Sequence, residues 1–174
     1  MKTLKFVVTA VTLILFAQVS SAQFIKAEVQ VSGLTCSMCQ LATEKAMKTI
    51  DFVATVEPDL NKNVYEISFK KGKNVNLDQI KKKVKDAGFS VSKLVVVFNF
   101  DQLKVSDNFH YTYGNSQYHF MNVGDKTLNG PVRLTVLDKD FIPAGDFKKW
   151  SAETKFDCYR TGVMGTTRTY HVTL

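Results

Sequence analysis

The sequence predicts an α+β protein in two parts, because its apolar pattern changes character near residue 98. Over residues 23–98 the pattern alternates between the period of two typical of strands and the longer period typical of helices. The resulting order, β-α-β-β-α-β, is the ferredoxin-like arrangement. Residues 99–174 instead carry short β-rich runs punctuated by Gly, Asn and Pro, which predict a small all-β domain, either an OB-like barrel or a sandwich.

The first half of the ferredoxin-like part is predicted to contain a strand, a helix and a hairpin, in that order. Apolar and polar residues alternate from Phe24 to Val31, which predicts a strand with one solvated face. Gly33 permits a turn, and apolar residues then recur at helical spacing between Cys39 and Ile50. Two β-rich runs, 52–57 and 64–69, flank a turn-forming segment and predict a hairpin.

A second helix and a long strand complete this part. Asn76 is suited to cap the start of the helix, and Gly88 is suited to end it. The outer face of this helix carries the lysine cluster at 81–85, which we interpret as a solvated face rather than a polyanion-binding patch. Residues 89–100 form a long β-rich run, which predicts the last strand.

The C-terminal part contains several short β candidates and one candidate helical turn, at 146–151. The predicted strands are 109–113, 117–123, 132–137, 155–160 and 167–174.

The first 22 residues predict a cleaved secretory signal peptide. Lys2 and Lys5 precede an uncharged, largely apolar run from Phe6 to Phe16, and small residues at 20–22 supply a cleavage site, so the mature chain would begin at Gln23. The run is too short to span a bilayer, so we expect no stable membrane anchor after cleavage. We therefore expect an exported protein, located in the periplasm, and export argues against a nucleic-acid partner.

Two of the three cysteines, Cys36 and Cys39, stand two residues apart between the first strand and the first helix. Two thiolates can hold a soft monovalent ion such as Cu(I) almost linearly, and a helix N-terminus favours the thiolate form. Tetrahedral zinc would need about two more ligands, which this loop does not supply. A metal clamp is the favoured interpretation, with a structural disulfide or a redox pair as the alternatives.

Three segments match a known family pattern: Gly33-Leu34-Thr35-Cys36-Ser37-Met38-Cys39, Val53-Ala54-Thr55-Val56 and Asp86-Ala87-Gly88-Phe89. Through them, residues 24–98 resemble the heavy-metal-associated domain, a family that includes copper chaperones, N-terminal regions of copper-transporting ATPases and the periplasmic mercury-binding protein. The resemblance implies that Cys36 and Cys39 bind Cu(I), or Hg(II) or another soft ion, and pass it to a partner through shared thiolates. The C-terminal part resembles no family that we identify.

Three positions near the loop qualify the resemblance. Leu34 replaces the usual Met, a swap of similar volume that should still anchor the loop in the core. Met38 occupies a position often held by a small residue, and we expect it to be exposed or packed rather than to ligate. Phe89 matches an aromatic residue that in bacterial members lies near the metal loop, where it would pack over the site.

The C-terminal part carries all three histidines, the third cysteine and two methionines. A second soft-metal site there is an alternative, but their spacing is not diagnostic and favours ordinary packing. For the cysteine we expect burial as a small apolar side chain rather than a role as a nucleophile, which would need an adjacent base. These residues are His110, His119, Met121, Cys158, Met164 and His171.

Together these features predict an exported binding protein, not an enzyme, that buffers Cu(I) through Cys36 and Cys39 or passes it to a protein partner. A periplasmic Hg(II)-binding protein is the alternative within the same class. Two alternatives come from other classes: a thiol-disulfide oxidoreductase with Cys36 as its nucleophile, and an exported adaptor whose metal loop is vestigial.

Overall fold

The computed structural model describes residues 23–59 and 61–174. The predicted signal peptide, residues 1–22, lies outside the described residues. Among the helices of the described segments, none has the length and apolar character needed to cross a membrane.

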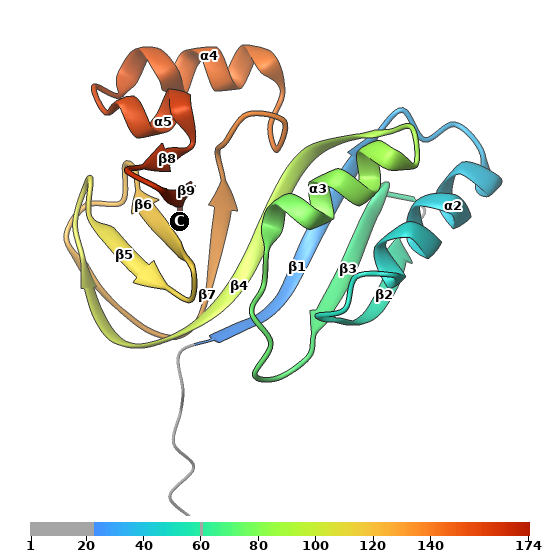
Figure 1. Cartoon of the computed structure of the whole chain (residues 1–174), viewed down its shortest axis with the longest axis horizontal. Coiled ribbons are helices and arrows are strands. Elements are labelled where there is room, and N and C mark those ends of the chain that lie inside the picture. Colours follow the sequence, from blue (N-terminus) through green and yellow to red (C-terminus); the bar gives the residue numbers. More distant parts are fainter. Residues whose placement is uncertain (1–22, 60) are drawn as a thin grey trace, which may run out of the picture.

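The described residues form one nine-stranded sheet and four helices (Figure 1). The strands are β1 (Gln23–Ser32), β2 (Val53–Asp59), β3 (Val64–Phe69), β4 (Ser90–Val105), β5 (His110–Tyr113), β6 (Ser116–Phe120), β7 (Lys126–Val136), β8 (Val163–Met164) and β9 (Thr167–Thr173). The helices are α2 (Ser37–Lys48), α3 (Leu77–Asp86), α4 (Ala144–Glu153) and α5 (Asp157–Thr161).

The ferredoxin-like part is confirmed in element order and in sheet order. Strands β2, β3, β1 and β4 lie side by side in that order, and β1 pairs antiparallel with both β3 and β4. Helices α2 and α3 both lie on the same face of these strands (Figure 1). Met47 of α2 and Ile80 of α3 are completely buried, so apolar stripes of both helices contribute to the core.

Strand β4 joins the two halves of the sheet. One edge of β4 pairs with β1 and the other with β7, so the strand runs through the predicted boundary between residues 98 and 99. All residues from Leu94 to Phe98 are buried, which is typical of a strand covered on both faces. Figure 1 shows β4 as the long curved strand from which β7, β9, β6 and β5 continue the sheet.

Aromatic side chains from both halves form one core. The rings of Phe24 in β1 and Phe98 in β4 lie 4.8 Å apart in an edge-to-face arrangement. The ring centroid of Tyr113 in β5 lies 4.8 Å from that of Phe98, and the ring centroid of Tyr118 in β6 lies 5.6 Å from that of Phe24. The sheet therefore curls so that its far strands, β5 and β6, return to the centre, and these aromatic contacts add to the gain from burial.

The prediction of an all-β C-terminal part is wrong, because α4 and α5 are helices. The helical turn expected at 146–151 is confirmed as part of α4, whereas the strand expected at 155–160 is α5. In α5, Cys158 and Tyr159 are both buried although they are adjacent, a pattern that a strand with one solvated face does not allow. Gly162 ends α5 in the left-handed conformation.

The barrel or sandwich expected for this part is not confirmed, since its strands join the same sheet as β1–β4. Strand β7 also begins earlier than the predicted 132–137. The added stretch contains Gly130 and Pro131, residue types that usually separate strands. Pro131 pairs opposite Asn99, and the register shift between Phe100 and Leu103 of β4 accommodates this irregular stretch.

A charged contact between α3 and the C-terminal strand holds the halves together. Arg168 of β9 donates from Nε to the carboxylate of Asp78 in α3 (2.7 Å). The Nη1 atom of Arg168 donates to Asp138 (3.0 Å) and to the carbonyl oxygen of Gly162 (3.0 Å). Burial by itself raises the pKa of Asp78, but the hydrogen bond and charge of Arg168 outweigh it, so the pKa lies below the ordinary 3.8.

Replacing Arg168 should destabilise the protein. Arg168→Ala leaves the carboxylate of Asp138, which is 5% exposed, without the arginine that pairs with it. We expect the free energy of unfolding to fall by roughly 2–3 kcal/mol, a smaller loss than that for breaking a fully buried pair. Urea denaturation measures the loss. Asp78, whose pKa Arg168 helps to lower, stabilises the fold only while it is ionised, so the difference from wild type should shrink as the pH falls below 3.8.

The matched control is Arg133→Ala, which removes an arginine paired with Glu28 on the exposed surface of the sheet. Exposed pairs contribute about 1 kcal/mol or less. Equal losses in the two variants would contradict the structural role assigned to Arg168.

Candidate functional site

The cysteine loop connects β1 to α2 at one end of the molecule. Cys36 is the N-cap of α2, and its Sγ accepts a hydrogen bond from the backbone N–H of Cys39 (3.1 Å). Cys36 is exposed and Cys39 is half-buried. The first turn of α2 contains no acidic residue, so the dipole at the helix start acts on the sulfurs without an opposing carboxylate in that turn.

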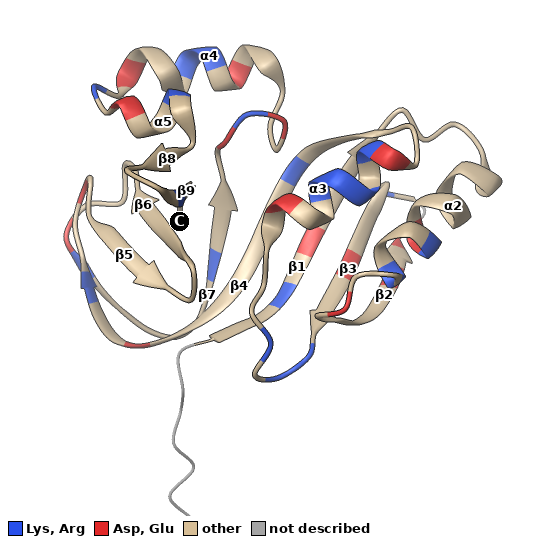
Figure 2. Cartoon of the chain, in the orientation of Figure 1, with Lys and Arg blue, Asp and Glu red and all other residues tan. Residues whose placement is uncertain are grey.

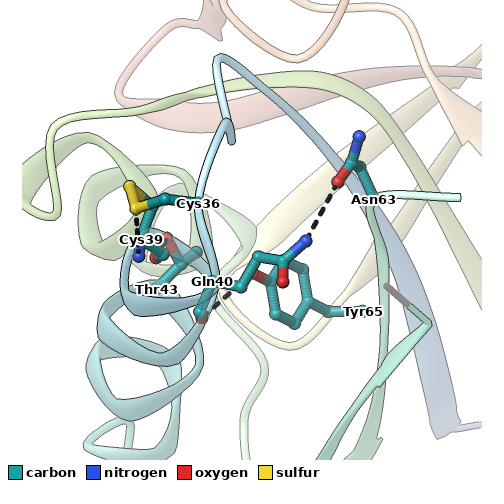
Figure 3. The surroundings of a disulfide bond; sticks show 6 residues. All are labelled: Cys36, Cys39, Gln40, Thr43, Asn63 and Tyr65. Carbon is teal, nitrogen blue, oxygen red and sulfur yellow. Dashed lines mark hydrogen bonds between the residues drawn. A yellow bond between two sulfur atoms is a disulfide. The ribbon is translucent and has the colours of Figure 1, made fainter. Parts of the chain in front are cut away.

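The two sulfurs of the loop form a disulfide, with the Cα atoms 5.2 Å apart (Figure 3). The loop therefore brings both sulfurs to one point at the surface, as a two-sulfur clamp also requires. The same backbone arrangement suits a disulfide and, after reduction, a pair of thiolates.

Side chains behind the loop fix the first turn of α2. The buried Tyr65 of β3 donates its hydroxyl hydrogen to the Gln40 carbonyl (3.1 Å), and Thr43 donates to the Cys39 carbonyl (2.9 Å). Gln40 also donates to the side chain of Asn63 (3.4 Å), as Figure 3 shows. Sequence analysis did not find Tyr65, whose only signal was its place on the buried face of a predicted strand.

Two expectations for the residues around the loop are confirmed, the anchoring of Leu34 in the core and the exposure of Met38. Leu34 is partly buried and packs against the core. Phe89 lies beside the loop, because a Cβ placed on Gly33 would lie 3.6 Å from its ring carbon Cδ1. Met38 is 72% exposed and so contributes nothing to the core. Gly33 has φ +90°, which is the left-handed region that glycine adopts without strain.

Positive charge lies on α3 (Figure 2). Lys81 and Lys82 pair with acidic residues of the same helix, Asp78 and Asp86, which agrees with a solvated, partly neutralised face. The prediction of a solvated lysine face therefore fits the structure.

The structure brings four of the six C-terminal candidates together: His110, His119, His171 and Cys158. Sγ of Cys158 lies 3.4 Å from Nε2 of His171 and 3.7 Å from Nδ1 of His119. Burial, together with the other two histidines, lowers the pKa of His119 to about 3, and burial raises the pKa of the Cys158 thiol. The expected burial of Cys158 is confirmed.

The two methionines do not share this arrangement. Met121 packs in a small apolar cluster with Leu137, and Met164 lies in β8 with an exposed side chain. The sequence had placed His119 and Met121 on one face of a strand, but β6 ends at Phe120, so the alternation does not continue to Met121.

A ferredoxin-like unit that carries a Cys-x-x-Cys loop at the start of its first helix is the class of protein that the fold and site define. Residues 28–90 match the heavy-metal-associated domain. Over 63 residues the chain is 30% identical to the copper chaperone CopZ of Staphylococcus haemolyticus (strain JCSC1435), covering 36% of this chain and 91% of that chaperone. The chain belongs to the heavy-metal-associated domain family.

Solved structures are also similar to part of the chain. A CopZ metallochaperone is 27% identical, with 41% of this chain and 98% of that chain covered and a TM-score of 0.34. Oxidized MerP from Ralstonia metallidurans CH34 is 25% identical, with coverages of 41% and 96% and a TM-score of 0.35.

A side chain at position 33 should disturb the loop through the backbone. At φ +90° an alanine is strained by about 1 kcal/mol, although its Cβ would make only an ordinary contact with Phe89. We expect Gly33→Ala both to lower stability and to weaken metal binding at the cysteines, as measured by chelator competition. Gly72→Ala is the control, because Gly72 has φ +73° with nothing within 4 Å of a Cβ. It should lower stability similarly and leave metal binding unchanged, so parallel effects on binding would contradict this prediction.

Proposed function

We propose that this chain is a metal-binding protein, not an enzyme, which binds Cu(I) through Cys36 and Cys39 and buffers it or passes it to a protein partner. The observation that carries the proposal is the meeting of the two sulfurs at the exposed start of α2. The chain's membership of the heavy-metal-associated domain family and its similarity to a copper chaperone support the same function.

The ligand chemistry favours a soft ion at this loop. Thiolates select soft ions, and a pair of them satisfies the low coordination number that Cu(I) accepts. The N–H of Cys39 and the dipole of α2 both stabilise negative charge on Cys36. A dithiolate also binds Hg(II) tightly, so mercury binding in vitro would not by itself identify the physiological ion.

The disulfide must be reduced before the loop can bind metal. Two thiols of a reductant supply the electrons and protons, become a disulfide themselves, and leave Cys36 and Cys39 as free thiols. Metal binding then displaces the thiol protons. The oxidised pair is thus a resting form that cannot take the ion.

Transfer to a partner requires that the partner's ligands reach the ion. Cys36 is exposed, and two apolar side chains next to it, Met38 and Leu41, are 72% and 38% exposed. Exposed apolar side chains around a polar site are typical of docking surfaces. A partner that docks there would contact the loop itself, as ligand exchange through shared sulfurs requires.

Anaerobic titration of the reduced protein with Cu(I), against a chromophoric chelator, tests this function. We expect a single tightly bound ion, because the two thiolates converge on one point. Cys36→Ser/Cys39→Ser should lose it, whereas Cys158→Ala should keep it. Equal binding by the loop variant and the wild type would place the ligands elsewhere and overturn the assignment. Turnover of a disulfide substrate that requires Cys36 but no metal would instead support a redox enzyme.

We also propose that the protein is exported to the periplasm after removal of residues 1–22. The support is the pattern of Lys2 and Lys5, an uncharged run and small residues before Gln23. Intact mass of the protein recovered from a periplasmic fraction should correspond to a chain that begins at Gln23. Detection of the full-length chain in the cytosol alone would contradict export.

A further inference from the structure

Three histidines lie next to one another on adjacent strands of the C-terminal half. His110 of β5 is the register partner of His119 in β6, which is in turn the register partner of His171 in β9. Partners in neighbouring strands share a face of the sheet, so the three imidazoles lie together. The rings of His110 and His119 stack with centroids 4.2 Å apart, and those of His119 and His171 lie 5.1 Å apart.

Helix α5 places the free thiol of Cys158 against these rings. Its Sγ lies 3.4 Å from Nε2 of His171 and 3.7 Å from Nδ1 of His119. Ligand atoms of His110, His119 and Cys158 all lie within 4.8 Å of one another. The inner part of the site is closed, since His119 and His171 are completely buried and Cys158 is 6% exposed, whereas His110 is half-buried.

The outer nitrogen of each imidazole is held by an oxygen. Nδ1 of His110 lies 3.0 Å from the Asn108 carbonyl, and Nε2 of His119 lies 3.3 Å from Oδ1 of the same residue. Nδ1 of His171 lies 3.2 Å from Oδ1 of Asp138. An oxygen acceptor requires an N–H at that position, so in each neutral ring the other nitrogen carries a lone pair.

This arrangement leaves more lone pairs than hydrogens inside the cluster. The thiol of Cys158 has one S–H to share among three imidazole nitrogens. Among the described residues, Nε2 of His110 is buried without a hydrogen-bond partner, which is unfavourable for a polar atom of this kind. A cation at the centre would accept all the lone pairs and remove this cost.

We propose that His110, His119, His171 and Cys158 form a second metal site, separate from the Cys36–Cys39 loop, for a Zn²⁺-type ion. With Zn–N near 2.05 Å and Zn–S near 2.3 Å, tetrahedral geometry puts the nitrogen and sulfur ligands about 3.5 Å apart. The two N···S distances found here, 3.4 and 3.7 Å, lie close to that value. Binding replaces the S–H bond of Cys158 by a metal–sulfur bond and releases the proton to solvent.

The surrounding groups are those that a bound ion needs. Metal-binding histidines usually donate their second N–H to a carboxylate or a backbone carbonyl, as His171 does to Asp138 and His110 does to the carbonyl of Asn108. Imidazole nitrogens suit Zn²⁺, whereas a pair of thiolates suits Cu(I). The two sites therefore differ in the ions that they select.

A catalytic thiol explains this cluster less well. Cys158, His171 and Asp138 are linked in the order of a nucleophile, a base and an orienting acid. A nucleophile must reach a substrate, but Cys158 is buried, and a triad would leave His110 and His119 without a role.

The cluster also lies far from the cysteine loop, because α2 and the strands β5 and β6 stand at opposite sides of the molecule (Figure 1).

Cobalt binding to the Cys36→Ser/Cys39→Ser protein tests the second site, because Co²⁺ reports its ligands by absorption and the loop sulfurs are absent. We expect a single equivalent with the strong visible bands of four-coordinate Co²⁺ and a near-ultraviolet thiolate band, all removed by Zn²⁺. Adding Cys158→Ala should abolish the thiolate band. Adding Asn108→Gly, which suits the φ of 63° but removes the acceptor for His119, should weaken affinity about 10–100-fold.

Met164→Leu is the matched control, because it removes an exposed sulfur donor from the same part of the chain and should change neither spectrum nor affinity. Circular dichroism establishes that each variant is folded, and Zn²⁺ should raise the melting temperature of the loop variant but not of the Cys158→Ala form. A near-ultraviolet thiolate band that survives Cys158→Ala would overturn the proposal. Rapid alkylation of Cys158 that Zn²⁺ does not slow would also overturn it, in favour of a nucleophile.

Discussion

The double pairing of β4 is the constraint on which the rest of the structure depends. This strand hydrogen-bonds to β1 along one edge and to β7 along the other, and it is buried over Leu94 to Phe98. A strand in this position fixes the register of its neighbours. A slip of one residue against β4 would turn the alternating buried side chains of β1 to the solvated face. The loop of Cys36 follows β1, and the cluster around Cys158 is built from strands that continue from β7. Both sites are therefore positioned, through the sheet, by the same strand.

Local patterns were enough to predict the ferredoxin-like part. Its strands alternate, its helices have caps such as Asn76, and its loop lies between the first strand and the first helix. In the C-terminal part, tertiary contacts overrode local signals. Pro131 reads as a turn residue, yet it lies within β7, where the irregular register of β4 accepts it. The pattern of residues 155–160 predicts a strand, yet the structure has a helical turn there, which allows the neighbouring residues Cys158 and Tyr159 both to be buried.

The two candidate sites differ in how far the sequence reveals them. Cys36 and Cys39 are neighbours in the chain, so their spacing alone indicates a shared site. His110, His119 and His171 become neighbours only through the pairing of β5 with β6 and of β6 with β9. The second of these pairings is parallel and joins segments far apart in sequence, and its register leaves no local mark. The three single histidines, each on a predicted strand, therefore favoured ordinary packing.

The position of β9 in the sheet also determines when the molecule can be completed. The β5–β6 hairpin reaches the rest of the sheet through β9, although β9 follows both strands in the chain. As the chain emerges from the ribosome, the ferredoxin-like part can pair its own strands, while the hairpin must wait for β9. Pairing between distant segments is slow because a long loop must first be closed. We therefore expect the N-terminal cysteine loop to be assembled before the C-terminal cluster of histidines and Cys158.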